Sequence, residues 1–136
     1  MYQSLQGNLG LGKAIEYFVS NGYTVSIPLN DTQKYDLVVE IDGKLNKISV
    51  KTSRQTNNGV SYSVQLRNTG GNKTGEIRQI PFDNTSCDYL FIYTANEKIY
   101  LIPAKEISAK NSICVGVKYS EFEVHVKTFQ DFIGSN

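Results

Sequence analysis

The chain has 136 residues, of which 40% are hydrophobic and 20% charged, and this ordinary globular composition excludes a disordered or collagen-like protein. The formal net charge of +1 does not by itself indicate a nucleic-acid-binding protein. No apolar run approaches the ~20 residues of a membrane span, and we expect no signal peptide. We therefore expect a single domain over residues 1–136, soluble and cytoplasmic, with no membrane partner.

The N-terminal part predicts a helix over residues 8–21. Its apolar residues recur at helical spacing and form one stripe, namely Leu11, Ala14, Ile15, Phe18 and Val19. Asn8 is a suitable N-cap, and Gly22 is well placed to end the helix.

A β-hairpin is predicted around Asp42-Gly43, because Asp-Gly favours a two-residue turn in which both residues have positive φ. With 42 and 43 as the loop, paired residue numbers sum to 85, and Asp36 lies opposite Ser49. Lys51 lies two residues further along on the face of Ser49. The hairpin therefore brings an acid, a short polar residue and a lysine onto one face.

The remaining elements are mostly short strands. Residues 23–27, 60–66, 88–94 and 98–102 are predicted strands, and residues 88–94 are apolar enough for a buried central strand. Residues 52–59 and 68–75 are expected to be polar loops, the second flexible by its Asn and Gly content. We predict a short helix over 103–110, edge strands over 112–117 and 122–126, and a helical turn over 128–133. The predicted fold class is α+β, with a mixed sheet and a long N-terminal helix.

The two cysteines, Cys87 and Cys114, lie in apolar strand-like segments without the spacing of a metal site. We expect both to be buried free thiols, as is usual in a reducing compartment.

Basic residues are concentrated in the middle of the chain. Seven lysines and arginines and a single acid, Glu76, lie between Lys44 and Arg78. This local excess fits either phosphate binding or a solvated basic face.

A carboxylate, a polar neighbour and a lysine at a strand end suit metal-assisted phosphodiester hydrolysis. An Asp and a Lys on neighbouring strands equally fit a solvated ion pair. His125, the only histidine, alternates with valines in a predicted edge strand, which favours a surface role.

The residues from 12 to 53, including KYDLVVEIDGKLNKISVKT, and from 88 to 107, DYLFIYTANEKIYLIPAKEI, resemble the PD-(D/E)XK nucleases associated with group I introns. The similarity covers about residues 7–107, leaving the strands and helical turn of 112–134 outside it. It implies a restriction-endonuclease-like α/β/α core and a site-specific double-strand DNA endonuclease of the intron-homing type. It also implies a Mg²⁺ (or Mn²⁺) cofactor and a homo-oligomer, dimer or tetramer, because cutting both strands requires two sites.

Carried over from the resemblance, Asp36 matches the metal-binding acid and Lys51 the catalytic lysine. Ser49 matches a third catalytic position, where an acid or amide is usual, and its hydroxyl can hold a metal-bound water but supplies no charge. A second departure from the family is Leu11, where many members carry a glutamate in the first helix. Leu11 also fits the apolar stripe of the helix. The departures leave two alternatives open, a DNA-binding module without catalysis and a structure-specific nuclease such as a junction resolvase.

With the resemblance, the polar face of the strand over 60–66 is expected to enter the major groove, where Arg reads guanine and Gln reads adenine. The expected DNA-binding residues are Arg54, Ser61, Ser63, Gln65, Arg67, Lys73 and Arg78.

Overall fold

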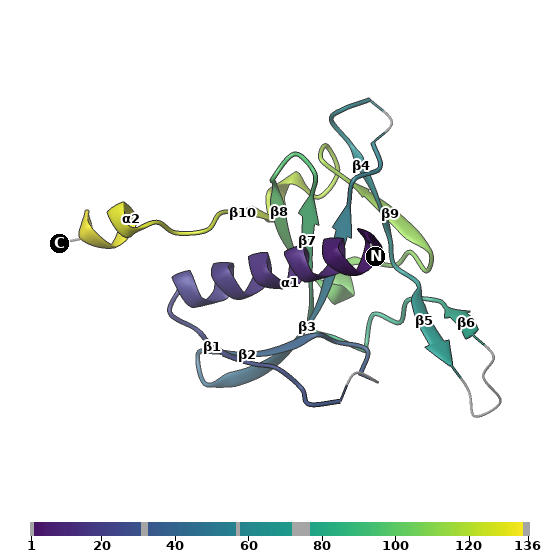
Figure 1. The fold of residues 1–136 in the computed structure, drawn as a ribbon, viewed down its shortest axis with the longest axis horizontal. Helices are drawn as coiled ribbons and strands as arrows, with labels where there is room; N and C mark the ends of the chain where they lie inside the picture. Colours follow the sequence, from purple (N-terminus) through teal and green to yellow (C-terminus); the bar gives the residue numbers. More distant parts are fainter. Residues whose placement is uncertain (1, 31–32, 57, 72–76, 135–136) are drawn as a thin grey trace.

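A computed structural model describes residues 2–30, 33–56, 58–71 and 77–134 (Figure 1). Its architecture is α+β, as predicted, and its centre is a six-stranded mixed sheet in the order β1-β2-β3-β7-β8-β10. These strands are β1 (Thr24–Ser26), β2 (Leu37–Ile41), β3 (Lys44–Ser53), β7 (Tyr89–Thr94), β8 (Ile99–Pro103) and β10 (Glu123–Val124). Two ribbons flank the sheet, formed by β4 (Tyr62–Gln65) with β9 (Ser112–Val115) and by β5 (Asn68–Gly71) with β6 (Ile77–Ile80).

The β2–β3 hairpin has the predicted register, with Leu37 opposite Ile48 and Ile41 opposite Lys44. Asp42 and Gly43 have φ angles of 53° and 82°, as a tight two-residue turn requires. The turn thus fixes which residues of β3 lie on which face of the sheet, because a shift by one residue would exchange the two faces.

Strand β7 is the buried central strand that the sequence predicts. It pairs in parallel with β3 and antiparallel with β8. Leu90 and Ile92 belong to an apolar cluster under the β4–β9 ribbon, whereas Phe91 belongs to a second cluster under the N-terminal helix. The sheet is therefore covered on both faces.

Helix α1 (Tyr2–Ser20) begins six residues earlier than predicted, so the interpretation of Asn8 as an N-cap is wrong. Ala14 and Phe18 are fully buried against the sheet, but Val19 is 57% exposed, and Tyr17 takes its place in the core. The chain turns at Gly22 with a φ of 81°, which confirms the predicted helix end.

At Gly10, helix α1 approaches β3 closely. A Cβ added there would overlap Thr52 Cγ2 and lie 3.4 Å from Val50 Cγ1. The Thr52 hydroxyl accepts a hydrogen bond from Gln6 Nε2 at 2.8 Å, one turn earlier in α1. The helix is thus seated on the alternate residues of β3 that face away from Lys51.

Two predicted loops contain strand pairing. Asn68–Gly71 pairs with Ile77–Ile80, so the prediction of a loop over 68–75 is wrong for its first half, and residues 72–76 lie outside the described chain. Strand β3 continues to Ser53, and Thr56 forms an isolated bridge with Tyr62. In both segments the polar composition suggested that the backbone N–H and C=O groups face solvent. Instead, pairing with another segment satisfies part of their hydrogen bonding.

The strand predicted over 60–66 is shorter, Tyr62–Gln65, and its ends differ. Tyr62, Val64 and Leu66 are buried as expected, but Val60 is 55% exposed.

The C-terminal third departs further from the predicted elements. The helix expected over 103–110 is a single 3₁₀ turn, η1 (Ala104–Glu106), and a second turn, η2 (Ser120–Phe122), precedes β10. The expected edge strand over 112–117 is β9, which pairs with β4 outside the main sheet. The predicted helical turn is confirmed as α2 (Phe129–Ile133), which lies away from the sheet at the end of an extended segment (Figure 1). Within the described chain, no helix is long and apolar enough to cross a membrane.

Candidate active site

Asp36 lies directly before β2 and is fixed by the backbone of β3. Its amide donates to the Ile48 carbonyl at 2.8 Å, and its Oδ2 accepts from the Val50 amide at 2.7 Å. Backbone pairing between β2 and β3 ends at Leu37. The Asp36 carboxylate therefore accepts the hydrogen bond from the Val50 amide that a further backbone carbonyl of β2 would otherwise accept. The Asp36 side chain is exposed, yet this charge-assisted hydrogen bond sets its orientation.

Lys51 follows on β3, on the face of the sheet opposite α1. Its Nζ donates to Asn68 Oδ1 at 2.8 Å. Burial lowers the pKa of Lys51, while the nearby Asp36 carboxylate and the Cys87 thiol act in the opposite direction. The structure therefore places a partly desolvated cation beside the Asp36 carboxylate, as the hairpin register predicts.

Asn68 is a residue of the site that the sequence did not indicate. It is the first residue of β5, where it pairs with Ile80. Its carboxamide oxygen is the acceptor for Lys51, so the β5–β6 ribbon is joined at its base to the lysine. The only local signal was a polar residue after a strand, which does not distinguish a site residue from a loop residue.

Ser49 and Cys87 are buried residues near Lys51. Ser49 is 3% exposed and Cys87 5% exposed. Burial raises the pKa of the Cys87 thiol to about 11, with a further contribution from Asp88, and Lys51 opposes this shift. At neutral pH Cys87 is therefore a protonated thiol and a poor nucleophile. The second cysteine, Cys114, is exposed, so the expectation that both are buried is wrong for it, although both are free thiols.

Leu11 packs half-buried against the apolar cluster between α1 and the sheet. Its position agrees with a core residue, and it brings no carboxylate to Asp36. The nearest acid in the helix sequence, Glu16, forms an exposed ion pair with Lys13 at 3.1 Å.

A divalent cation at this site would have Asp36 as its carboxylate ligand. No group of three Asp, Glu, His or Cys residues gathers anywhere in the part of the chain that the structure describes. Mg²⁺ is commonly held by one or two carboxylates together with substrate phosphates and waters. The residues therefore fit a cation that is shared with a bound phosphate.

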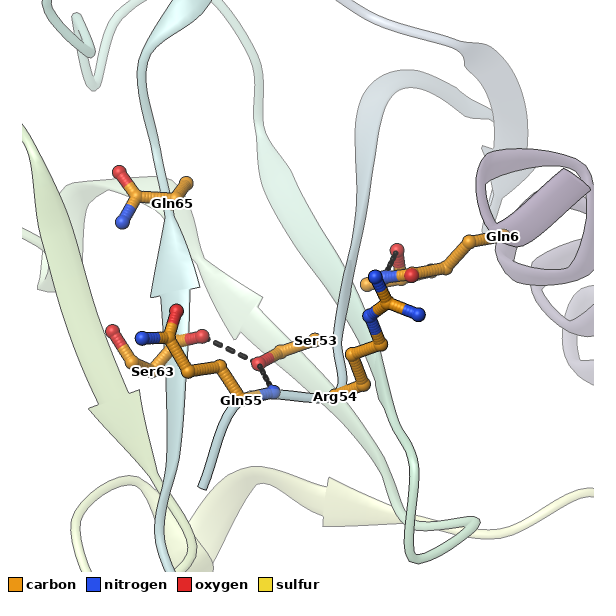
Figure 2. A pocket seen from close by; sticks show the side chains of 7 residues that line it. Gln6, Ser53, Arg54, Gln55, Ser63 and Gln65 are labelled. Atoms are coloured by element: carbon orange, nitrogen blue, oxygen red, sulfur yellow. Dashed lines mark hydrogen bonds between the residues drawn. The ribbon is translucent and has the colours of Figure 1, made fainter. Parts of the chain in front are cut away.

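A polar pocket of about 360 Å³ opens at the end of β3, beside Lys51. Figure 2 shows Gln6 from α1, Arg54 and Gln55 directly after β3, and Ser63 and Gln65 from β4 around it. Ser53 Oγ donates to the Ser63 carbonyl and accepts from the Gln55 amide, which fixes the two strands to each other. Three expected DNA-binding residues, Arg54, Ser63 and Gln65, thus line one hollow.

The other expected DNA-binding residues are dispersed. Arg67 is exposed and donates from Nε to Asn111 Oδ1 at 2.8 Å, while Ser61 is half-buried beside the Asn58 turn. Arg78 lies on β6, although its side chain is outside the described part, and Lys73 lies outside it altogether.

Three comparisons place this geometry among known proteins. A family model described as PD-(D/E)XK endonuclease matches residues 1–133. Protein 5.3 of Escherichia phage T7 is 36% identical over 101 residues, which cover 73% of this chain and 78% of that protein. The structure of I-Ssp6803I, a bacterial homing endonuclease, superposes with a TM-score of 0.69 and 30% identity, over 82% of this chain and 76% of that chain. The resemblance inferred from the sequence is confirmed, and the chain belongs to the PD-(D/E)XK endonuclease family.

Proposed function

We propose that this chain is a divalent-metal-dependent DNA endonuclease whose catalytic residues are Asp36 and Lys51. The observation that carries the proposal is the pairing of a backbone-anchored carboxylate with a desolvated lysine on adjacent strands of a nuclease fold. Desolvation strengthens the interaction of Lys51 with the negative charge that develops on a phosphate.

Each residue has a distinct task in the proposed reaction. When bound, a divalent cation supplies Lewis-acid polarisation of the phosphate and lowers the pKa of a water. Asp36, oriented by the Val50 amide, would hold that cation, and Lys51 would stabilise the developing phosphate charge. Asn68 holds the Lys51 ammonium in place as a positioning residue.

The two departures from the family pattern, Leu11 and Ser49, determine how fast we expect the protein to cleave DNA. Leu11 and Ser49 supply no second charge, so Asp36 holds the cation with little help. Mg²⁺ or Mn²⁺ is therefore expected to bind weakly to the free protein and more tightly when DNA contributes phosphate oxygens. Slow cleavage follows from the same single carboxylate.

We further propose that the substrate is duplex DNA cut at a preferred site, as in homing. The similarity to I-Ssp6803I supports this extension, as does Arg54 in the polar pocket at the end of β3. Cutting both strands with one site per chain requires two copies, and the exposed Phe129 and Ile133 of α2 offer apolar area for a contact between them. Light scattering of the purified protein tests this, and a monomer at working concentration would contradict it.

The test of the proposal is conversion of a supercoiled plasmid carrying a random-sequence insert library, with Mg²⁺, with Mn²⁺ and with EDTA. Nicked or linear product is expected with either metal and not with EDTA, with cut ends that share a sequence. Product that persists in EDTA would contradict the metal requirement.

One observation favours a second candidate, a DNA-binding module without catalysis. Asp36 is the carboxylate that acts on Lys51, and no group of three Asp, Glu, His or Cys residues gathers among the described residues to hold a metal without a substrate phosphate. This candidate predicts salt-dependent duplex binding without product in either metal. A junction-specific nuclease would instead cut a four-way junction in preference to the linear duplex.

A further inference from the structure

Two hollows meet at the end of β3 and share Arg54. The polar pocket of about 360 Å³ opens toward Gln55 and Gln65, and a second hollow of about 230 Å³ opens toward Tyr93 and Leu9. Gln6, Thr52, Ser53 and Arg54 line both of them. The two hollows therefore adjoin across these four residues, and we call the pair of hollows, with the exposed Arg54 in their common wall, the furrow.

The furrow lies next to the proposed catalytic lysine. Ser53 is on the same face of β3 as Lys51, two residues or about 7 Å along the strand. Asn68, which holds Lys51, follows Gln65 by three residues. A strand with one phosphate at Lys51 can thus continue directly into the furrow.

The two sides of the furrow differ in chemistry. The polar side carries carboxamides, which offer both a donor and an acceptor to a base edge, and no acid among the described residues that line it. The other side is lined by Leu9 and the half-buried Tyr93 ring, with Glu97 exposed in the adjoining turn. The Lys13 ammonium lies over the Tyr93 ring, 5.4 Å from its centroid, so Leu9 and the uncovered part of the ring are the surface that suits a base or sugar. Arg54 supplies the positive charge between them.

The furrow is too small for a duplex, since each hollow has the size of a small-molecule site or less. A nucleotide enters only after leaving the base stack, which costs a few kcal/mol in a paired duplex and little where the strand is already unpaired.

We propose that this furrow binds an unpaired two-nucleotide segment of the DNA strand beside the scissile phosphate, with Arg54 on the phosphate between the two nucleotides. The inference rests on the proposed nuclease function and adds a preference for DNA that is gapped, forked or opened next to the cut.

The direct test is a titration of ¹⁵N-labelled protein with the dinucleotide d(TpT), followed by chemical shifts in the absence of metal. Shifts are expected at residues 52–55 between the hollows, at residues 63–65 on the polar side and at residues 93–95 on the other side. Arg54→Ala should weaken binding at least about tenfold, as for loss of one charged hydrogen-bond partner. Lys105→Ala is the matched control, because Lys105 is exposed and lines a separate hollow beside the start of β7, so binding should not change.

Two results of the titration would overturn the proposal. One is an equal response to inorganic phosphate alone, which would reduce the furrow to an anion site. The other is no shift at residues 52–55 or 93–95 with d(TpT). Because Arg54 is exposed, Arg54→Ala is expected to fold normally. A spectrum of the variant that is unchanged outside the furrow checks this.

A competition experiment then tests DNA itself. In EDTA, a duplex with a two-nucleotide gap should displace labelled d(TpT) at least about tenfold better than the fully paired duplex of the same sequence. The reason is that the gapped strand does not have to leave the base stack before it binds. Arg54→Ala should remove this difference, and Lys105→Ala should keep it. Equal competition by the two duplexes would contradict the proposal. Both experiments measure binding alone, so they can succeed even if the protein does not cleave DNA. If they fail, the cleavage test of Asp36 and Lys51 can still be carried out and interpreted.

Discussion

The contact between α1 and β3 gives a prediction whose size can be worked from the structure. At Gly10 the substitution Gly10→Ala places a methyl group against Thr52 Cγ2, with Val50 Cγ1 3.4 Å away. The Thr52 methyl cannot rotate away freely, because the hydroxyl on the same carbon accepts the hydrogen bond from Gln6. The helix therefore has to shift against the strand, and this hydrogen bond is lost in the shift.

Three contributions set the magnitude for Gly10→Ala. Overpacking costs about 1–3 kcal/mol, loss of the hydrogen bond about 1 kcal/mol, and the better helix propensity of alanine returns about 1 kcal/mol. The free energy of unfolding is thus expected to fall by about 1–3 kcal/mol, and Tm by about 3–9 °C for a chain of this size. Gly12→Ala is the control, since nothing lies within 4 Å of its Cβ position, and it should raise the free energy of unfolding by about 0.5–1 kcal/mol.

Urea and thermal denaturation of both variants measure the difference. A Gly10→Ala protein as stable as Gly12→Ala would refute the close contact between α1 and β3. It would also refute the position of Gln6, which that contact brings next to Thr52 near the end of β3.

Three further predictions concern the site. First, Lys51→Met should unfold at a urea concentration no lower than the wild-type at pH 7. Burial lowers the pKa of Lys51 in the fold, so between that pKa and the unfolded value near 10.5 the unfolded chain binds more protons and wild-type stability rises with pH. The advantage of Lys51→Met should therefore shrink toward pH 10, and an advantage that grows with pH would be contrary to this reasoning. Second, Asn68→Ala should lower kcat for DNA cleavage about tenfold, as for loss of one hydrogen bond, with KM unchanged. Asn68→Asp, which keeps an acceptor, should recover most of the rate, and a change confined to KM would assign Asn68 to DNA binding. Third, iodoacetamide at pH 8 should add one label to the native protein, at the exposed Cys114, and a second at Cys87 only in urea, as read by mass spectrometry. Two labels on the native protein would contradict the burial of Cys87.

The hairpin at Asp42-Gly43 was predictable because its register depends on two adjacent residues and on local alternation. Asp36 and Lys51 follow from that register, so the sequence was enough to bring them together. Strand β7 was equally clear from its apolar composition, although nothing local indicated that it pairs in parallel with β3.

The errors arose where distant contacts decide the conformation. Residues 2–7 have no apolar stripe of their own, yet α1 extends through them, and Gln6 is bonded to Thr52, 46 residues away. The Asn- and Gly-rich segment after Arg67 has loop composition, but the 77–80 strand pairs with it and places Asn68 on Lys51. Such pairings are not encoded in any short window.

The central claim, that Asp36 and Lys51 form the catalytic pair of an endonuclease, is tested most directly by comparing four proteins on one supercoiled plasmid in Mg²⁺ and in Mn²⁺. The wild-type and Lys44→Met, which removes an exposed lysine of the same strand, are expected to give nicked and linear product at similar rates. Asp36→Asn and Lys51→Met should each lower the rate by at least about 100-fold, the contribution of one group acting on the transition state. Cleavage that continues at the wild-type rate in both of these variants would contradict the account.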